Sequence, residues 1–196
     1  RLCGLSFRIS SHSFYQVNAV QTEVLYEAAI ELAHLQGTER ILDAYCGTGT
    51  IGLVAARALQ EKSPAAAKDG ALVVGVDKVE SAIVDARNNA KHNGIENASF
   101  IAEDAGAFMN EMAGRGEALD VLFMDPPRSG ASLEFLQATA RLHPRRIVYI
   151  SCNPKTQARD VAYLREQGYR LEAIQPVDMF PHTTHIENIC ALVAAD

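Results

Sequence analysis

From residue 40 onward, apolar β-branched runs alternate with stretches of helical periodicity, and this alternation constrains the fold more than any other feature. Helices between successive strands imply parallel strand neighbours, with helices packed on both faces of the sheet. We therefore expect an α/β, Rossmann-like fold with a mostly parallel seven-stranded sheet. The expected strands are 40–45, 71–77, 98–102, 119–124, 146–151, 169–177 and 189–194, and the expected helices are 51–60, 79–93, 105–113, 132–142 and 155–167.

The two ends of the chain depart from this alternation. Only a short irregular piece, residues 178–188, joins the last two strands, so we expect an antiparallel closing strand. Residues 1–37 lead into the sheet through a short strand at 5–10 and an amphipathic helix at 20–35. We treat 1–196 as a single domain, because 196 residues, 48% of them hydrophobic, suffice for one self-sufficient core.

Charge and cysteine content narrow the classes of function. A net charge of −6 argues against a domain that grips nucleic acid by itself, though not against one that acts with another domain. No apolar run approaches the ~20 residues that cross a bilayer, and no secretory signal opens the chain. The four cysteines form no C-x-x-C pair, so we expect free thiols, a cytoplasmic setting and no membrane partner.

A glycine-rich turn lies between the strand 40–45 and the helix after it. Gly47, Gly49 and Gly52 spell G-x-G-x-x-G, and Asp77 ends the next strand, which is the pattern of dinucleotide sites. Asp43, at the mouth of the turn, disfavours a pyrophosphate but suits the ammonium group of S-adenosylmethionine. Asp77 would bind the ribose hydroxyls of either cofactor. A third interpretation is that the glycines only allow close packing of strand and helix.

The strand 119–124 ends at Asp125-Pro126-Pro127-Arg128. Two consecutive prolines cannot continue a parallel ladder, so the chain turns at the carboxyl edge of the sheet, where α/β proteins bind ligands. An acidic residue before two prolines resembles a motif of nucleobase methyltransferases, in which enzymes for exocyclic amines carry an aromatic residue fourth. Arg128 at that position disfavours an amine target. Taken alone, the tetrapeptide is equally typical of a rigid strand exit.

The strand 146–151 brings Cys152 to the same edge, just before a helix with Pro154 in its first turn. The positive end of that helix favours the thiolate form of Cys152. A lone cysteine is more often a small buried hydrophobic residue. The expected position of Cys152 near Asp125 favours a chemical role instead.

Together these motifs resemble those of the RNA (uracil-5-)-methyltransferases, which use S-adenosylmethionine and a class I methyltransferase fold to form 5-methyluridine in ribosomal or transfer RNA. The resemblance covers the whole chain in order, at 14–18, 43–52, 125–128, 151–154 and 178–187. It implies that Cys152 is the nucleophile and Glu187 the base. It also implies cofactor contacts by Gln16, Tyr45, Thr50, Asp77 and Asp125, with Asp104 near the adenine, to which the glycine turn adds Asp43, Gly47 and Gly49.

The chemistry of uracil gives an independent reason for a thiol and a carboxylate. Carbon 5 is a poor nucleophile until a thiolate adds at carbon 6 and generates an enolate, which attacks the sulfonium methyl group. The proton left on carbon 5 must then be removed before the thiolate departs, and a carboxylate can take it. Without the resemblance, Glu187 would be interpreted as an exposed acid at a strand start.

The resemblance also sets expectations about partners. We expect an RNA substrate, ribosomal in preference to transfer RNA, and a monomeric protein. His182 and His185 lack a third ligand, so we expect them to contact the loop or the substrate and expect no metal site. The residues expected to contact phosphate near the site are Arg128, Arg145, Arg146, Lys155 and Arg159.

The remaining expectations concern the extent of the domain and the alternative functions. Enzymes of this kind often carry an N-terminal RNA-binding barrel, and some an iron–sulfur cluster. Because the chain starts at Arg1 and not at Met, we expect an excised catalytic domain without that barrel. The alternative functions are cytosine-5 methylation by the same thiolate addition and a non-catalytic module that binds a nucleotide cofactor.

Overall fold

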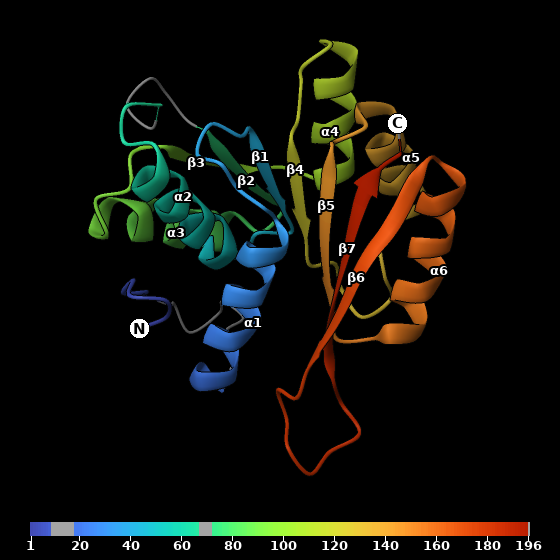
Figure 1. The fold of residues 1–196 in the computed structure, drawn as a ribbon. Coiled ribbons are helices and arrows are strands. Elements are labelled where there is room, and N and C mark those ends of the chain that lie inside the picture. The colour runs from blue at the N-terminus through green and yellow to red at the C-terminus, as the bar shows by residue number, and fades with distance from the viewer. Residues whose placement is uncertain (9–17, 67–71, 196) are drawn as a thin grey trace.

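The computed structural model describes residues 1–8, 18–66 and 72–195. Within these residues, strands form one sheet in the order β3-β2-β1-β4-β5-β7-β6, with helices on both faces (Figure 1). The strands are β1 (Ile41–Ala44), β2 (Val73–Asp77), β3 (Ala98–Ala102), β4 (Val121–Met124), β5 (Arg146–Ser151), β6 (Tyr169–Val177) and β7 (Glu187–Ala194). The helices are α1 (Ala19–Leu32), α2 (Thr50–Lys62), α3 (Glu80–His92), α4 (Ala105–Gly114), α5 (Leu133–Leu142) and α6 (Pro154–Glu166).

The pairing pattern confirms the predicted fold class. Strands β1 to β5 are all parallel to one another, whereas β7 runs antiparallel to both β5 and β6. The chain continues from β1 outward to β2 on one side and later returns to β4 on the other. The carboxyl ends of β1 and β4 therefore flank the point where the strand order reverses, which is where open α/β sheets bind ligands.

Alternate residues of each central strand enter two separate cores. In β4, Val121 and Phe123 pack in the core that contains α1, α2 and α3, and Leu122 and Met124 pack in the core with α4, α5 and α6. All of these side chains are fully or almost fully buried. A central strand buried on both faces must be apolar throughout, which is why these runs are recognisable in the sequence.

Most predicted elements agree with the observed ones within a few residues. The strands predicted at 98–102, 146–151 and 169–177 have these same bounds. The last strand begins two residues earlier than predicted, at Glu187, because its first residues pair with the ends of β5 and β6. This extension moves Glu187 from the predicted loop into the sheet, where it is buried.

The short strand expected at 5–10 is wrong for the part that the structure describes, where the main chain pairs with two side chains of α3. Asn93 accepts a hydrogen bond from the Ser6 N–H (2.9 Å) and donates one to the Ser6 carbonyl (2.8 Å). Asn89 does the same for Arg8, at 2.8 and 3.1 Å. Alternate residues of an extended chain match helix positions four apart. Two asparagine amides therefore take the place of a neighbouring strand.

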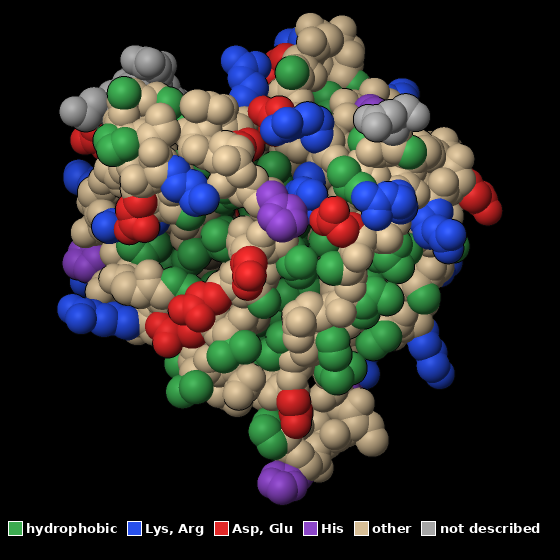
Figure 2. All heavy atoms as spheres, viewed as in Figure 1, with side chains coloured by type: hydrophobic (Ala, Val, Ile, Leu, Met, Phe, Trp, Pro, Cys, Tyr) green, Lys and Arg blue, Asp and Glu red, His purple; other side chains and the backbone are tan. Residues whose placement is uncertain are grey.

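Charges of both signs share the molecular face shown in Figure 2. Lys and Arg side chains lie among Asp and Glu side chains on this face, and hydrophobic side chains gather over α1 and the β6–β7 pair. Val20 and Val24 of α1 and Ile174 of β6 are among the exposed large hydrophobic residues. In the described part of the chain, no helix has the length and apolar character needed to cross a membrane.

Candidate active site

The loop between β1 and α2 owes its shape to three glycines with different roles. Gly47 and Gly49 have φ of +52° and +78°, a region in which side-chain-bearing residues are strained. A Cβ at Gly49 would lie 2.7 Å from the Phe100 ring, and one at Gly52 would lie 2.8 Å from the Asp43 carboxylate. A Cβ at Gly47 would meet no atom within 4 Å. Close packing thus explains Gly49 and Gly52, whereas Gly47 borders open space.

Asp77, at the end of β2, fastens this loop from the neighbouring strand. One carboxylate oxygen accepts a hydrogen bond from the Gly47 N–H (3.0 Å), and the other accepts one from the Val79 N–H (2.9 Å). The side chain is only partly buried. Each carboxylate oxygen can accept more than one hydrogen bond, so Asp77 retains capacity for ligand hydroxyls at the carboxyl edge of the sheet.

Asp43 does not stand at the mouth of the loop as expected. It is 1% exposed, and one of its oxygens accepts a hydrogen bond from the Gly52 N–H in the first turn of α2 (2.8 Å). Burial raises the pKa of Asp43 to about 7, although the Gly52 hydrogen bond opposes this rise and the Asp77 charge adds to it. Asp43 therefore supplies a negative charge beneath the loop and not an accessible contact above it.

Two further predicted contacts are already engaged with other helices. The Tyr45 ring packs against Phe135 of α5, with centroids 5.1 Å apart, and Tyr45 has a φ of +62°. Burial raises the pKa of its phenol. The Thr50 hydroxyl lies 2.9 Å from the Tyr26 hydroxyl of α1. Tyr45 thus forms a wall between the loop and α5, and Thr50 connects the loop to α1.

Asp104 begins α4 as its N-cap. It is exposed, and one carboxylate oxygen accepts hydrogen bonds from Gly106 N–H (2.9 Å) and Ala107 N–H (3.1 Å). The carboxylate lies at the same edge of the sheet as Asp77, because β3 follows β2 in the parallel order. Its predicted place near an adenine is compatible with this position.

Gln16 lies outside the described residues, as does the rest of its motif except Asn18. Asn18 caps α1 by accepting a hydrogen bond from Gln21 N–H (3.2 Å), and it donates one to the Met179 carbonyl (3.0 Å). Met179 is fully buried. Two segments of the predicted motif pattern, 14–18 and 178–187, are therefore joined directly.

The second half of the site lies at the carboxyl ends of β4 and β5 and the start of β7. Ser151 pairs with Asn188 in the antiparallel β5–β7 ladder, so Cys152, the next residue, lies across from Glu187. Asp125 follows β4, the parallel neighbour of β5. Because β4 and β5 are parallel neighbours, Cys152 and Asp125 follow them at the same edge of the sheet, as predicted.

These groups share an acidic, poorly solvated environment. Burial, together with the negative charges of Glu187 and Asp43, raises the pKa of Asp125 to about 8. Burial also raises the pKa of Glu187, which is 5% exposed. A carboxyl group with a raised pKa is a stronger base once ionised, which suits proton removal near neutral pH.

The prediction that helix α6 favours the Cys152 thiolate is wrong in its net effect. Burial raises the pKa of this thiol above its ordinary value, and the charges of Glu187 and Asp125 raise it further. The Arg128 guanidinium and a main-chain hydrogen bond at Cys152 lower the pKa and so oppose this rise. Two nearby carboxylates and desolvation outweigh the partial positive charge of a helix end.

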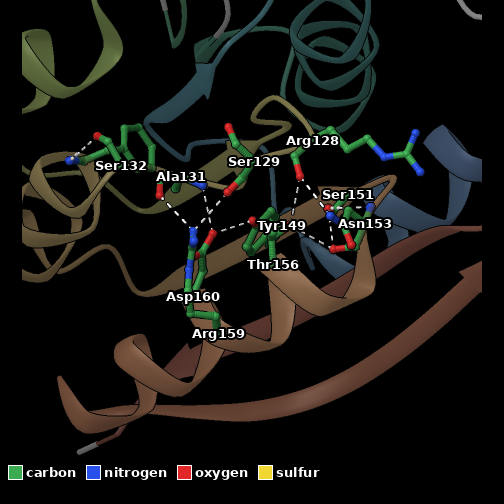
Figure 3. A network of polar contacts seen from close by, with 11 residues as sticks. Arg128, Ser129, Ala131, Ser132, Tyr149, Ser151, Asn153, Thr156, Arg159 and Asp160 are labelled. Atoms are coloured by element: carbon green, nitrogen blue, oxygen red, sulfur yellow. Dashed lines mark hydrogen bonds and ion pairs between the residues drawn. The ribbon is translucent and has the colours of Figure 1, made fainter.

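Arg128 connects three segments of this edge, and Figure 3 shows its contacts with Asn153 and Thr156. Its carbonyl accepts hydrogen bonds from Asn153 Nδ2 (3.0 Å) and Thr156 Oγ1 (3.2 Å), at the start of α6. Its guanidinium Nη2 lies 3.3 Å from His185 Nδ1, in the segment before β7. The loops that carry Asp125, Cys152 and Glu187 are thus tied together.

Two of the arginines expected to contact phosphate lie at the wrong edge of the sheet. Arg146 is the first residue of β5, and a six-residue strand separates it by about 20 Å from the edge that carries Cys152. Arg146 also forms an ion pair with Glu172, and Arg145 lies 3.0 Å from Asp120. Closeness in sequence misled the prediction, because a strand carries its two ends to opposite edges.

Sequence reasoning missed a buried glutamine that supports the start of β7. Gln157 Nε2 donates to the carbonyls of Tyr149 (2.8 Å) and Asn188 (3.0 Å), and Gln157 Oε1 accepts from Asn188 Nδ2 (2.6 Å). Gln157 lies on the same buried stripe of α6 as Val161 and Leu164. A polar side chain on an apolar helix stripe was the available signal, since buried polar groups need specific partners.

The described part of the chain contains no group of three or more His, Cys, Asp or Glu residues able to hold a metal ion. His182 and His185 are exposed in the segment between β6 and β7. Cys3, Cys46, Cys152 and Cys190 are free cysteines.

Comparisons with known proteins agree with these motifs. A family model described as tRNA (Uracil-5-)-methyltransferase matches residues 4–194. A curated protein from Enterococcus faecalis, an uncharacterized RNA methyltransferase, is 47% identical over 191 residues, which are 97% of this chain and 39% of that protein. One of the same description from Staphylococcus aureus is 47% identical over 189 residues, 96% of this chain and 39% of that protein. The chain thus spans about two-fifths of the length of the curated relatives it matches.

Solved structures extend the comparison to the fold. The crystal structure of the Pyrococcus abyssi tRNA (uracil-54, C5)-methyltransferase in complex with S-adenosyl-L-homocysteine matches with a TM-score of 0.78 and 36% identity, over 98% of this chain and 43% of that one. A SAM-dependent methyltransferase from Agrobacterium tumefaciens matches with a TM-score of 0.71 and 19% identity, over 100% of this chain and 69% of that one. The latter likeness concerns the fold alone, and it confirms the predicted class I methyltransferase architecture.

Proposed function

The chain belongs to the tRNA (uracil-5-)-methyltransferase family, and from this membership and the geometry of the site we propose that it methylates carbon 5 of a uridine in RNA, with S-adenosylmethionine as methyl donor. The observation that carries the proposal is the placement of Cys152 across from Glu187 where β5 and β7 meet. A thiol and a buried carboxylate close together at one edge of the sheet are the two groups that this chemistry requires.

The glycine loop and the acidic groups around it fit S-adenosylmethionine better than a dinucleotide. Gly47 borders open space beside the loop, and Asp77 has remaining acceptor capacity for ribose hydroxyls. Asp43 and Asp125, which are partly ionised near neutral pH, place partial negative charge on either side of the point where the strand order reverses. That charge favours a cofactor with a sulfonium and an ammonium group and disfavours a pyrophosphate. Residues expected to hold the cofactor are Gln16, Tyr45, Gly47, Gly49, Thr50, Asp77, Asp104 and Asp125.

When bound, S-adenosylmethionine supplies an electrophilic methyl group. The Cys152 thiolate adds to carbon 6 of uracil, which forms an S–C6 bond and moves negative charge toward carbon 5 and the carbonyl at position 4. After carbon 5 has gained the methyl group, Glu187 removes the remaining proton from that carbon. The electrons of the C5–H bond then form the C5=C6 double bond, and the S–C6 bond breaks to release the thiolate.

Two variants separate the roles of the nucleophile and the base. Cys152→Ala should abolish methylation and leave no covalent complex with RNA, because nothing then activates carbon 5. Glu187→Gln should still allow addition and methyl transfer, whereas loss of a general base slows proton removal by about 10²- to 10⁴-fold. This variant should accumulate as an adduct with methylated RNA that survives denaturing gel electrophoresis. Normal turnover by Glu187→Gln would show that another group is the base.

The target RNA is part of the proposal. The sequence led us to favour ribosomal RNA, but the family description and the Pyrococcus abyssi protein both refer to tRNA, which supports tRNA at least as well. Unmodified tRNA and rRNA transcripts, each incubated with the chain and analysed by nucleoside mass spectrometry, distinguish the two. The same measurement separates 5-methyluridine from 5-methylcytidine and so tests cytosine methylation as the alternative. Failure to methylate either base in either RNA would contradict the proposal.

A further inference from the structure

A set of side chains at the start of α6 grips the loop that follows β4. We propose that this set, which we call the α6 clamp, positions the Asp125 and Arg128 side chains relative to Cys152, and that Asp160 is its central positioning residue. The inference rests on the proposed function, because it assigns these residues to the same reaction. The clamp consists of Asn153, Thr156, Arg159 and Asp160, and the loop it holds spans residues 125–131 (Figure 3).

Asp160 is a fully buried carboxylate whose two oxygens are both used. One oxygen accepts hydrogen bonds from the Ala131 N–H of the loop (2.8 Å) and the Tyr149 hydroxyl of β5 (2.7 Å). The other lies 2.8 Å from Arg159 Nε and 2.7 Å from Arg159 Nη2. Asp160 thus connects three elements, β5, α6 and the loop after β4.

Arg159 extends the grip toward the middle of the loop. Its Nη2 donates to the carbonyls of Ser129 (3.2 Å) and Ala131 (3.3 Å). The loop backbone approaches the ion pair closely at Gly130, whose φ is +83°. A Cβ there would lie 2.6 Å from Arg159 Nη2 and 2.7 Å from the Asp160 carboxylate. This close contact requires glycine at position 130 and restricts how the loop can lie against α6.

The other end of the clamp lies next to Cys152. Asn153 and Thr156 donate to the Arg128 carbonyl, at 3.0 and 3.2 Å. The Asn153 N–H in turn donates to the Ser151 hydroxyl (3.1 Å), directly before the thiol. The same few residues therefore determine where the loop after β4 and the loop after β5 lie with respect to each other.

The chemical cost of the clamp argues for a role beyond stability. The Asp160 carboxylate is fully buried, whereas the Arg159 side chain that pairs with it is 59% exposed, so the burial of Asp160 costs free energy that its hydrogen bonds only offset. The loop itself offers few apolar anchors, since Pro127, Arg128 and Ser129 are exposed. Reaction rates respond to a misplacement of about 1 Å by as much as 10²-fold. Polar contacts to the carbonyls of Arg128, Ser129 and Ala131 and to the Ala131 N–H supply the accuracy that apolar contacts lack.

Two matched tyrosines make the test possible. Tyr149→Phe removes the hydroxyl that binds Asp160, and Tyr169→Phe removes a hydroxyl that donates to the Pro144 carbonyl (3.0 Å) at the opposite edge of the sheet. Both tyrosines are buried, and each hydroxyl makes one such contact. Both variants should therefore lower the midpoint of urea unfolding, so that a loss of stability by itself would affect the two alike.

The kinetic readout uses tRNA and rRNA transcripts that contain 5-fluorouridine, together with S-adenosylmethionine. Fluorine on carbon 5 cannot leave as a proton, so addition and methyl transfer end in a stable covalent adduct. At saturating RNA, Tyr149→Phe should form this adduct about 10- to 100-fold more slowly than the wild type, as should Asp160→Asn. Tyr169→Phe should react at the wild-type rate. The affinity of Tyr169→Phe for S-adenosylhomocysteine should stay within about twofold of wild type, because its hydroxyl binds the Pro144 carbonyl at the opposite edge of the sheet.

Equal adduct rates for Tyr149→Phe and Tyr169→Phe would overturn the positioning role and reduce the clamp to a structural network. A slow Tyr149→Phe reaction that returns to the wild-type rate at higher RNA concentration would also overturn it, since that pattern indicates weaker RNA binding. If the wild type forms no adduct with either RNA, the proposed function fails, and this result is distinct from a failure of the clamp alone.

Discussion

The two halves of the site are built by different means. At the ends of β1, β2 and β3, carboxylates accept hydrogen bonds from main-chain N–H groups, as Asp43 does from Gly52 and Asp77 does from Gly47. At the ends of β4 and β5, side chains bind one another and the loop carbonyls, as in the α6 clamp. The geometry of the first half depends on the backbone conformation of the loop and on glycines, which carry no side chain. The second depends on the identity of particular side chains.

This difference predicts opposite sensitivities to substitution. A change at Gly49 or Gly52 should damage the fold, because the added Cβ would lie less than 3 Å from atoms of buried neighbours. A conservative change in the second half should leave the fold nearly intact and alter the reaction. The predictions below test that contrast, beginning with the largest expected effect.

Gly49→Ala should destabilise the chain by about 2–4 kcal/mol, since the added Cβ meets Phe100 and Ala86 at a φ of +78°. Gly47→Ala is the matched control. It has a positive φ as well, but its Cβ would meet no atom within 4 Å, so its cost should stay near about 1 kcal/mol. Urea unfolding of both variants measures the difference. Equal costs would show that strain and not packing governs the loop.

The same contrast explains what the sequence allowed us to predict. Regular strand–helix alternation identified the sheet, and glycines with acidic residues at strand ends identified the first half, because backbone requirements restrict residue type locally. Asp125, Cys152 and Glu187 were recognised from the order of the motifs, and parallel and antiparallel pairing then brings them to one edge.

The remaining features depend on contacts between distant segments. The sequence does not show which groups Asp160 and Gln157 of α6 bind. Their partners, Tyr149 and Ala131 for Asp160 and Asn188 for Gln157, come from other segments. The pKa of Cys152 depends on carboxylates that come from other strands, so the adjacent helix end was a misleading guide. The segment at 5–10 was likewise misjudged, since its partners are side chains and not a strand.

Asp125→Asn should stabilise the chain at high pH, in contrast to the glycine variants. The folded pKa of about 8 exceeds the value of about 3.9 expected for an unfolded aspartate. Between these values the folded state binds the extra proton, so wild-type stability falls as pH rises from about 4 through 8. The variant should gain on the order of 1–3 kcal/mol at pH 9 and much less at pH 5.

Thermal unfolding at both pH values measures this gain as a rise in melting temperature of several degrees at pH 9. Asp104→Asn is the control, since asparagine also caps helices well and Asp104 is exposed. A gain for Asp125→Asn that is the same at pH 5 and pH 9 would show that packing and not charge is responsible.

Alkylation of Cys152 by iodoacetamide should reveal the charges of the second half directly. The rate follows the thiolate fraction, so it should still be rising at pH 9 because the thiol pKa is raised. Glu187→Gln removes a negative neighbour and should lower the midpoint, and Arg128→Gln removes the positive one and should raise it. Shifts of the same sign would contradict the arrangement, and Cys152→Ser provides the background rate of the other thiols.

The smallest expected effect concerns a charge interaction that crosses between the two halves. Asp43 belongs to the first half and Asp125 to the second. Burial, together with the charges of Glu187 and Asp43, raises the pKa of Asp125 to about 8, and burial raises that of Asp43 to about 7. Both are therefore partly protonated at pH 7.5. A cationic cofactor bound at this edge of the sheet would lower both pKa values and release protons, whereas S-adenosylhomocysteine, with its neutral sulfur, would do so less.

Calorimetry in phosphate and in Tris buffer measures this release, because the two buffers differ in ionisation enthalpy. At pH 7.5, S-adenosylmethionine should release about 0.3–1 proton more than S-adenosylhomocysteine. The difference should vanish near pH 10, where both carboxyl groups are already ionised, and it should shrink in Asp125→Asn but persist in Asp104→Asn. Equal proton release by the two ligands at pH 7.5 would contradict this charge interaction. A positive charge near two partly protonated carboxyl groups must displace protons from them.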